Sequence, residues 1–504
     1  MAKTHLDMAF IAARASKPVN HRTPLRTILH LLGLLLVLFS STMLPPIGIG
    51  WWYGDGAVLP FVITFALTLG TGLGCWLPVR HEPAKLYNRD GFVVVVAFWF
   101  ALSLLSALPF MLSEQPRMRF VDAVFEATSG LTTTGATILS GLDQLPHAIV
   151  YYRAQLNFLG GMGIVVLAVA LLPMLGIGGM QLYRAETPGP MKEEKLTPRI
   201  AETAKKLWYV YVSLAIACAL SFWLAGMSLF DAIAHSFSTL ALGGFSTHDA
   251  SIGYFQSPVI ELVAGVFSLL AGINFALHFL AWRSRSLKPI LADPEFRFYC
   301  WVMGLIVLTV CGTLYLNDTF PAWESFYHGF FQAISITTDN GLVTVGYPAD
   351  WPLFIGLLLI MASFFGGCAG STCGAIKAIR FLLLYRQSVR ETRLLIHPTA
   401  QIPIKVGERV MSNRIIQAVW GFYFLYIFSY CAFSLALAAT GVDLVTAFGS
   451  VAGCLNNMGV GFGETAVGFG VLNDTAKWLL SLSMVVGRLE VFPLLLLFLP
   501  EFWR

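Results

Sequence analysis

The sequence has 504 residues, of which 57% are hydrophobic and only 12% are charged, with 32 basic and 28 acidic side chains. Because a soluble domain carries roughly 25% charged residues, this composition excludes a soluble globular enzyme, and so much apolar material also excludes a disordered chain. Eight cysteines in a chain of this length exclude a small secreted scaffold held by disulfides.

Long uncharged stretches predict membrane helices. A helix needs about 20 mostly apolar residues to cross a bilayer, and the stretches of 18 or more residues without a charged side chain are 27–54, 56–79, 91–113, 154–183, 207–230, 262–282, 298–317, 351–376, 415–442 and 444–463. We interpret all but 444–463 as transmembrane helices, because 444–463 ends in Asn456-Asn457 and a run of glycines. A tenth helix is predicted at 474–499, where Arg488 and Glu490 interrupt the apolar run.

The basic residues predict the orientation of these helices. Of the 32 Lys and Arg residues, 27 fall in segments on the same side as the N-terminus, and four fall on the opposite side. Cytoplasmic segments carry an excess of Lys and Arg, so both termini of a chain with ten spans are expected to be cytoplasmic. Arg488 is left inside the membrane.

Four shorter segments between the spans align with one another without gaps. In each segment, a polar residue followed by Ala or Gly precedes a terminal glycine by 13 residues; the terminal glycines are Gly135, Gly244, Gly341 and Gly459. A second small-residue cluster follows each of them by 26–28 residues, at Gly161, Gly272, Gly367 and Gly487. Self-similarity of this kind indicates one unit used four times.

Each unit has the order span, half-helix of about nine residues, extended Gly-bearing segment, span. Non-helical backbone at membrane depth is tolerated only where it lines a cavity or is buried in protein. Four such segments around one axis provide the carbonyl oxygens of a cation filter, and glycine supplies the positive φ that such a backbone often needs. All four units share one orientation, which favours a central pore over the midplane site of inverted-repeat transporters.

The predicted fold is therefore an all-α integral membrane protein with four pseudo-symmetric span–half-helix–span repeats around a central pore, plus two extra N-terminal transmembrane helices. The expected divisions are an N-terminal part with the two extra helices, then four pore repeats, of which the third carries an intramembrane loop: 1–90, 91–183, 184–282, 283–390 and 391–504.

Four motifs resemble those of the potassium-transporter superfamily that includes the bacterial Trk and Ktr translocating subunits and the plant HKT proteins. They are Thr-Thr-Thr-Gly-Ala-Thr at 132–137, Leu-Gly-Gly-Phe-Ser-Thr-His-Asp at 242–249, Gly-Gly-Cys-Ala-Gly-Ser-Thr at 366–372 and Leu-Asn-Asn-Met-Gly-Val-Gly-Phe-Gly-Glu at 455–464. The resemblance runs from about residue 91 to the end, and the two extra N-terminal spans resemble the Trk type.

The resemblance implies K⁺ uptake and a selectivity filter made by Thr133, Thr134, Gly135, Leu242, Gly243, Gly244, Asp339, Asn340, Gly341, Asn457, Met458 and Gly459. K⁺ is expected at Thr133, Thr134, Leu242, Gly243, Asp339, Asn340, Asn457 and Met458. The implied gate consists of Gly366, Gly367, Gly370, Ser371, Thr372, Gly374 and Arg488. The transported K⁺ is the expected ion, and no organic cofactor is expected in this chain.

Three features have two interpretations each. Asp339 stands where the family more often has Thr, and it either changes the cation environment or lies behind the filter, bonded to backbone N–H groups. The glycines at 366–374 either allow close helix packing or break the helix to form a gate. Arg488 either acts in the pore or pairs with Glu490, although residues two apart on a helix do not face each other.

The resemblance also implies partners and a location. We expect a homodimer in the lipid bilayer of the cytoplasmic (inner) membrane of a bacterium, controlled by a cytoplasmic nucleotide-binding subunit of the Trk-A type, and no nucleic acid. The segment 377–414 carries eight basic residues, which are either ordinary cytoplasmic charge or a docking surface. An ion-coupled K⁺ symporter, driven by H⁺ or Na⁺, is the alternative function. No catalytic constellation recurs in the sequence, so a membrane-embedded enzyme is not expected.

Overall fold

The computed structural model describes residues 24–80, 88–170 and 196–503. Secondary structure in these ranges is helical except for one short antiparallel hairpin, which is formed by β1 (Lys405–Val406) and β2 (Arg409–Val410). The expected cytoplasmic N-terminus, the connection at 81–87, the end of the 154–183 span and most of the 184–206 connection lie outside these ranges. The structure confirms the predicted all-α membrane fold.

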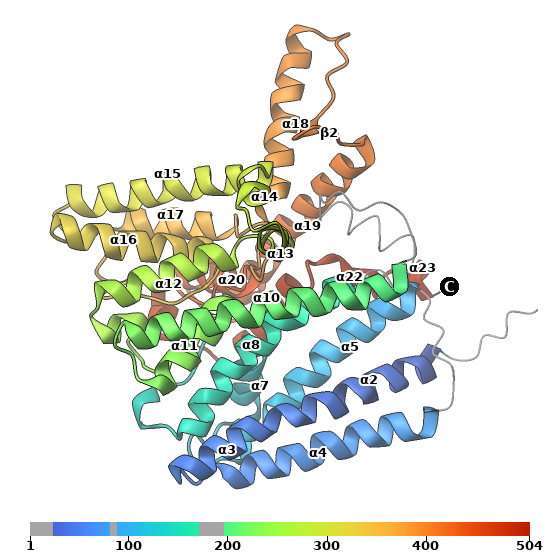
Figure 1. Ribbon diagram of the computed structural model, residues 1–504, viewed down its shortest axis with the longest axis vertical. Helices are drawn as coiled ribbons and strands as arrows, with labels where there is room; N and C mark the ends of the chain where they lie inside the picture. Colours follow the sequence, from blue (N-terminus) through green and yellow to red (C-terminus); the bar gives the residue numbers. More distant parts are fainter. Residues whose placement is uncertain (1–23, 81–87, 171–195, 504) are drawn as a thin grey trace, which may run out of the picture.

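Two helical rods precede the repeats. The first joins α2 (Pro24–Ser40), η1 (Ser41–Met43) and α3 (Leu44–Tyr53), and the second joins α4 (Val58–Trp76) and η2 (Leu77–Val79). They cross at Gly33 and Gly72, where an added Cβ would lie 2.7 Å from Trp76 N and 2.8 Å from Val37 N, respectively. Small residues let membrane helices approach closely, so the two rods lie side by side at one edge of the molecule (Figure 1).

Four repeats follow in chain order. Repeat one contains α5 (Asn88–Ser106), α6 (Leu108–Leu112), α7 (Phe120–Leu131), η3 (Leu142–Gln144) and α8 (His147–Ala170). Repeat two contains α10 (Leu196–Leu224), α11 (Leu229–Ala241), η4 (Ser251–Phe255), α12 (Pro258–Ala271) and α13 (Phe275–Ser284). The short helix α14 (Lys288–Leu291) begins repeat three. Repeat three contains α15 (Pro294–Leu316), α16 (Ala322–Thr337), α17 (Leu353–Ser363) and α18 (Ala378–Ile396). Repeat four contains α19 (Asn413–Ala438), α20 (Leu444–Leu455), η5 (Gly463–Val467), η6 (Phe469–Val471), α21 (Asp474–Arg488), α22 (Phe492–Leu496) and α23 (Pro500–Trp503).

The half-helices are present in all four repeats. They are α7, α11, α16 and α20, with 12, 13, 16 and 12 residues, so they are longer than the nine residues expected from the sequence. A membrane-spanning helix needs about 20 residues, and none of the four is long enough. The exclusion of 444–463 as a span is thereby confirmed, because α20 ends at Leu455.

The second spans are mostly broken. Six helices in the described ranges are long and apolar enough to cross a membrane by themselves, and a seventh candidate, α12 with α13, is bent by 93°. The stretch 351–376 holds a helix of 11 residues, α17, followed by a loop, as its glycines indicated. An unbroken helix over 262–282 or 474–499 is a wrong prediction, because Asn274 starts a new helix and the turn after Arg488 has positive φ at Glu490 and Val491.

A buried ion pair of the first repeat also contacts the second repeat. The Arg153 guanidinium donates from Nε to Glu126 Oε1 at 2.8 Å and from Nη1 to the Ser246 carbonyl at 3.0 Å, and it lies 4.2 Å from the centre of the Phe245 ring. Both charged side chains are 1% exposed or less. The sequence placed Arg153 on the outer side of the membrane but gave no sign of this pairing.

This ion pair yields a stability prediction. Replacing Arg153 by Met leaves the Glu126 carboxylate buried without its counter-charge, which costs about 3–5 kcal/mol in comparable cases. We expect a clear drop in the unfolding temperature of the purified protein in detergent. Arg119→Gln is the matched control, because the Arg119–Asp474 pair is mostly exposed and a surface pair contributes little. Equal unfolding temperatures for both variants would contradict the structural role of Arg153.

Candidate ion pore and gate

The four segments that follow the half-helices share one backbone conformation. In each, the residue two positions before the terminal glycine and the glycine itself both have positive φ; the pairs are Thr133 (51°) and Gly135 (82°), Leu242 (54°) and Gly244 (70°), Asp339 (62°) and Gly341 (76°), and Asn457 (59°) and Gly459 (81°). The positive φ expected of the glycines is therefore present in all four repeats. Non-glycine residues adopt this region rarely, so the shared pattern shows that the same structure is built four times.

The same four segments form a closed ring. An added Cβ on Gly135 would lie 2.5 Å from the Gly243 carbonyl oxygen, and one on Gly244 would lie 2.6 Å from the Asn340 oxygen. One on Gly341 would collide with the Met458 oxygen, and one on Gly459 with the Thr134 oxygen. Each glycine thus abuts the residue that precedes the glycine of the next repeat, and the fourth repeat returns to the first.

The glycines are also the points at which the ring is open to solvent. Gly135, Gly244, Gly341 and Gly459 are each partly exposed. The residues directly before and after each of them are buried; these are Thr134, Ala136, Gly243, Phe245, Asn340, Leu342, Met458 and Val460. The structure therefore places the twelve predicted filter residues together, with only their glycine backbones accessible.

One polar residue of each half-helix holds the extended segment in place. Glu126 accepts hydrogen bonds from Ile138 N at 3.0 Å and Thr137 Oγ1 at 2.9 Å, and Gln332 accepts one from Thr344 N at 2.9 Å. His235 and Ser450 bond to the Ser246 and Thr465 hydroxyls. These four residues occupy the same position in the repeat, four residues after its start, and sequence analysis missed them although they are the polar members of apolar helix faces.

Two asparagine side chains of the predicted filter form hydrogen bonds within the ring and to the helix beside it. Asn457 Nδ2 donates to Thr134 Oγ1 at 2.9 Å, which joins the fourth repeat to the first, and Asn340 Nδ2 donates to Ser268 Oγ at 2.8 Å. Leu242 and Met458 are part of the buried core. These side chains are buried, and the partly exposed part of each segment is its terminal glycine.

All predicted gate residues except Arg488 lie in the loop that follows α17 and crosses to other repeats. Thr372 Oγ1 donates to the Leu240 carbonyl at the end of α11 at 2.9 Å. An added Cβ on Gly374 would collide with the Asn456 carbonyl at the end of α20. The loop therefore reaches the carboxyl ends of two half-helices, and its residues from Phe364 to Lys377 are buried except for Gly370, which is partly exposed. Close helix packing alone does not describe this segment, because it is not helical.

The loop is held by backbone bonds to a second helix break. Cys368 N donates to the Gly272 carbonyl at 2.8 Å, and Phe275 N donates to the Gly370 carbonyl at 3.1 Å. Gly366 and Gly370 have positive φ of 64° and 77°, which glycine adopts without strain. Glu295, buried at the start of α15, also accepts from Ala369 N at 2.6 Å. The predicted loop at 366–374 and the unpredicted bend at Gly272 thus supply each other's hydrogen bonds.

Arg488 contacts the loop directly. Its Nη1 donates to the Thr372 carbonyl at 3.0 Å, and its side chain is 6% exposed. No bond between Arg488 and Glu490 occurs among the described residues. Glu490 instead pairs with Lys377 at 3.0 Å and Arg380 at 2.6 Å, at the end of the loop and the start of α18. Two of the eight basic residues in 377–414 are therefore buried in this cluster, which sequence analysis missed because it joins two repeats.

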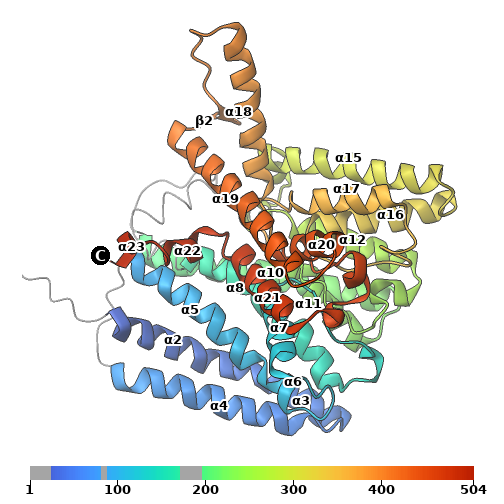
Figure 2. The same ribbon diagram turned by 180° about the vertical axis from the view of Figure 1, so that it is seen from behind.

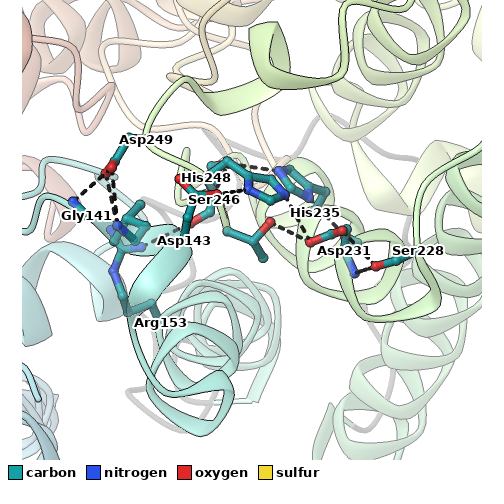
Figure 3. Close-up of polar contacts among 11 residues, drawn as sticks. Gly141, Asp143, Arg153, Ser228, Asp231, His235, Ser246, His248 and Asp249 are labelled. Atoms are coloured by element: carbon teal, nitrogen blue, oxygen red, sulfur yellow. Dashed lines mark hydrogen bonds and ion pairs between the residues drawn. The ribbon is translucent and has the colours of Figure 1, made fainter.

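A polar cluster ties the first two repeats together through the loops that follow their extended segments (Figure 3). His248 bonds to Asp143 through Nδ1, lies 3.4 Å from Asp231 through Nε2 and stacks on Tyr254, while Asp249 accepts from Gly141 N at 2.8 Å. Burial alone would lower the pKa of His248, but its bonds to the two carboxylates outweigh burial and raise the pKa above its usual value. These carboxylates are engaged in holding the loops together.

Comparisons with known proteins agree with this architecture. The family model described as "TrkH: Cation transport protein" matches residues 59–504. A protein of Vibrio parahaemolyticus named Trk system potassium uptake protein TrkH is 53% identical over 484 residues, which cover 95% of this chain and 99% of that protein. Its namesake in Escherichia coli K12 is 51% identical over 480 residues, with the same coverage of both chains.

A solved structure shares the fold. The crystal structure of the potassium transporter TrkH from Vibrio parahaemolyticus matches with a TM-score of 0.88 at 50% sequence identity, and the match covers 95% of this chain and 99% of that one. The relatives are named as transport proteins and not as enzymes, as the sequence led us to expect. The chain therefore belongs to the TrkH family of cation transport proteins.

Proposed function

We propose that this protein takes up K⁺ across the cytoplasmic membrane through a pore lined by the four Gly-bearing segments. One observation carries the proposal: four equivalent glycines, each partly exposed between buried neighbours, close into a ring in which each repeat abuts the next. The names of the relatives supply the ion, since each is described as a potassium uptake protein.

The filter works through backbone carbonyls. The residues expected to hold K⁺ are Thr133, Thr134, Leu242, Gly243, Asp339, Asn340, Asn457 and Met458, whose carbonyl oxygens replace part of the hydration shell of the ion. A ring of fixed size requires a backbone that does not relax around a smaller ion. The bonds made by Glu126, His235, Gln332 and Ser450 provide that support in each repeat.

The gate is the loop after α17 together with Arg488. The loop lies against the carboxyl ends of α11 and α20, which aim the negative ends of their dipoles at the pore. Arg488 binds the loop through Thr372 and places a positive charge in the path of a cation. In a low-dielectric channel this charge repels K⁺ more strongly than it would in water. Opening requires the loop and Arg488 to separate.

A cytoplasmic partner would act through the projection made by α18, β1, β2 and α19. This projection extends beyond the helical bundle in both views (Figures 1 and 2). It exposes basic side chains for an acidic surface of a nucleotide-binding regulator of the Trk-A type; they are Arg393, Lys405, Arg409 and Arg414. We propose that the protein works in this way as a homodimer in the inner membrane, with both termini cytoplasmic. The domain divisions given above are part of the same proposal.

The filter is tested by Gly135→Ser. The new side chain meets the Gly243 oxygen and must adopt a positive φ, so the ring cannot keep its size. We expect the protein to insert normally but to lose selectivity for K⁺ over Na⁺, measured as tracer uptake into liposomes. Gly74→Ala is the control, because an added Cβ there meets nothing within 4 Å. An unchanged K⁺/Na⁺ ratio in Gly135→Ser would show that Gly135 is not part of the filter.

Uptake measured with and without a proton gradient separates a channel from an H⁺-coupled symporter.

The gate is tested by Arg488→Ala and by a short deletion within 368–374. A hydrogen bond from a charged group contributes roughly 1.5–3 kcal/mol, and about 1.4 kcal/mol is a factor of ten in an equilibrium. We therefore expect basal K⁺ flux without a regulator to rise about tenfold or more. Arg488→Lys should restore closure only in part, since it loses the planar guanidinium. Arg117→Ala, at an exposed position between α6 and α7, serves as the control. Flux at the wild-type level in both gate variants, with normal folding, would refute the gate.

The Glu490 cluster is tested by Glu490→Gln, which keeps the shape of the side chain and removes its charge. The loop ends at Lys377, so weakening the Lys377–Glu490 and Arg380–Glu490 pairs frees its carboxyl end. We expect higher basal flux in liposomes without a regulator. Glu391→Gln makes the same charge change on the exposed part of α18 and should leave basal flux unchanged. If the two variants behave alike, Glu490 does not hold the gate closed.

A further inference from the structure

Asp339 is a fully buried carboxylate that the pore described so far does not use. It is 0% exposed, and neither of its oxygens has a hydrogen-bond partner among the described residues. The interpretation that places it behind the filter, bonded to backbone N–H groups, therefore lacks the bonds it requires. Its equivalents in the other repeats are Thr133, Leu242 and Asn457, so only the third repeat brings a negative charge to this position.

The side chain of Asp339 faces the gate loop. In repeat one, the equivalent residue Thr133 has its Cγ2 atom 3.0 Å from the position of an added Cβ on Gly160, in the second span of that repeat. In repeat four, Asn457 Oδ1 lies 3.1 Å from the position of an added Cβ on Gly487, also in the second span. Asp339 Oδ2 lies 3.3 Å from the corresponding point on Gly366. In repeat three, the loop takes the place of the second span at this point. The side chain of Asp339, which points in the same direction as those of Thr133 and Asn457, therefore contacts the gate loop and not a helix.

Arg488 reaches the same loop from the fourth repeat. Its Nη1 is bonded to Thr372, but its Nε and Nη2 are buried without a hydrogen-bond partner in the described part of the chain. Asp339 lies against the loop at Gly366 and Arg488 lies against it at Thr372, so the two side chains of opposite charge contact the same loop. Arg488 is therefore the cationic side chain that shares the loop with Asp339, although it makes no direct hydrogen bond to either carboxyl oxygen in the described part of the chain.

A buried carboxylate is stable only when a cation or hydrogen bonds compensate for its lost hydration. When the gate opens, Arg488 leaves Thr372 and its charge moves away from Asp339. K⁺ is the cation that the proposed pore delivers to this region, because Asp339 precedes the ring glycine Gly341 by two residues and its carboxylate faces the loop. Thr337 and Asn340, on either side of Asp339 in the chain, carry further buried oxygens that lack partners among the described residues.

We propose that Asp339 is a cation-binding residue between the filter and the gate, and that Arg488 and K⁺ compete for it. This inference rests on the proposed pore and gate. When the loop is closed, the positive charge of Arg488 compensates the Asp339 carboxylate. When the loop opens, K⁺ takes the place of Arg488 as the counter-ion of that carboxylate. A ligand shifts a two-state equilibrium by its differential affinity for the two states. K⁺ bound at Asp339 therefore favours the open pore, and the transported ion helps to open its own path.

The competition predicts a dependence between two substitutions. Removing the guanidinium with Arg488→Ala leaves Asp339 to K⁺ alone, so the protein should bind K⁺ more tightly. Coupling between two ligands is typically about 5–150-fold, and we expect the K⁺ concentration for half-saturation to fall by about fivefold or more. In the double variant Asp339→Asn/Arg488→Ala this gain should disappear. Asp339→Asn alone should bind K⁺ more weakly than the wild type.

The measurement is the unfolding temperature of the full-length purified protein in detergent, titrated with KCl against choline chloride at constant ionic strength. A ligand that binds the folded state stabilises it by mass action, so the titration gives the half-saturating K⁺ concentration of each protein. The filter also binds K⁺, but it is common to all four proteins and cancels in the comparison. Asp318→Asn is the matched control, since Asp318 also has positive φ and its residue is exposed. If Arg488→Ala does not fold, Arg488→Gln takes its place.

The outcomes separate this inference from the gate itself. Tighter K⁺ binding in Arg488→Ala that is lost in the double variant supports the competition. An unchanged half-saturating concentration in Arg488→Ala, or the same gain with and without Asp339, overturns it. Basal flux is measured on the same preparations. If basal flux rises in Arg488→Ala but the K⁺ affinity does not change, the proposed gate stands and the proposed role of Asp339 in it is refuted.

Discussion

Non-helical backbone within a membrane must find hydrogen-bond partners inside the protein or in a water-filled space, because lipid offers none. The rest of this structure depends on that constraint. The backbone of four extended segments lacks the hydrogen bonds of a helix. Each segment is instead held by a polar residue of its own half-helix, from Glu126 in the first repeat to Ser450 in the fourth. The loop after α17 meets the same constraint by bonding to the bend at Gly272. The carbonyls left over at the ring are the ones available to a cation.

The buried charges are arranged around that backbone and differ in how fully they are compensated. Arg153 and Glu126 form a direct pair and stabilise the outer support of the ring. Glu490 joins Lys377 and Arg380 where the loop passes into α18. Arg488 and Asp339 lie against the same loop with unused hydrogen-bonding atoms. A buried charge with unsatisfied hydrogen-bonding atoms gains most from a rearrangement, and for this reason we propose that the moving parts of the pore lie here.

Much of the pore could be predicted from the sequence because it is repeated. Four glycines at matching positions indicated one backbone shape, and the run of small residues from Gly366 to Gly374 indicated a break, since both depend on local conformational preference. The bend at Gly272–Asn274 was not predicted, because its neighbours are apolar and its partner is a loop about a hundred residues away. The Glu126–Arg153 pair within the first repeat and the pairs of Glu490 were missed because their members lie far apart in the chain. Contacts between repeats leave no trace in the pattern of one segment.

The central claim is that the ring of Gly135, Gly244, Gly341 and Gly459 binds the transported ion. Rb⁺ replaces K⁺ in carbonyl sites and scatters X-rays anomalously, so diffraction from crystals of this protein grown in RbCl tests the claim most directly. The account predicts anomalous peaks on the axis between the four glycines. An intact ring with no peak on its axis, and Rb⁺ bound only elsewhere in the protein, would contradict it.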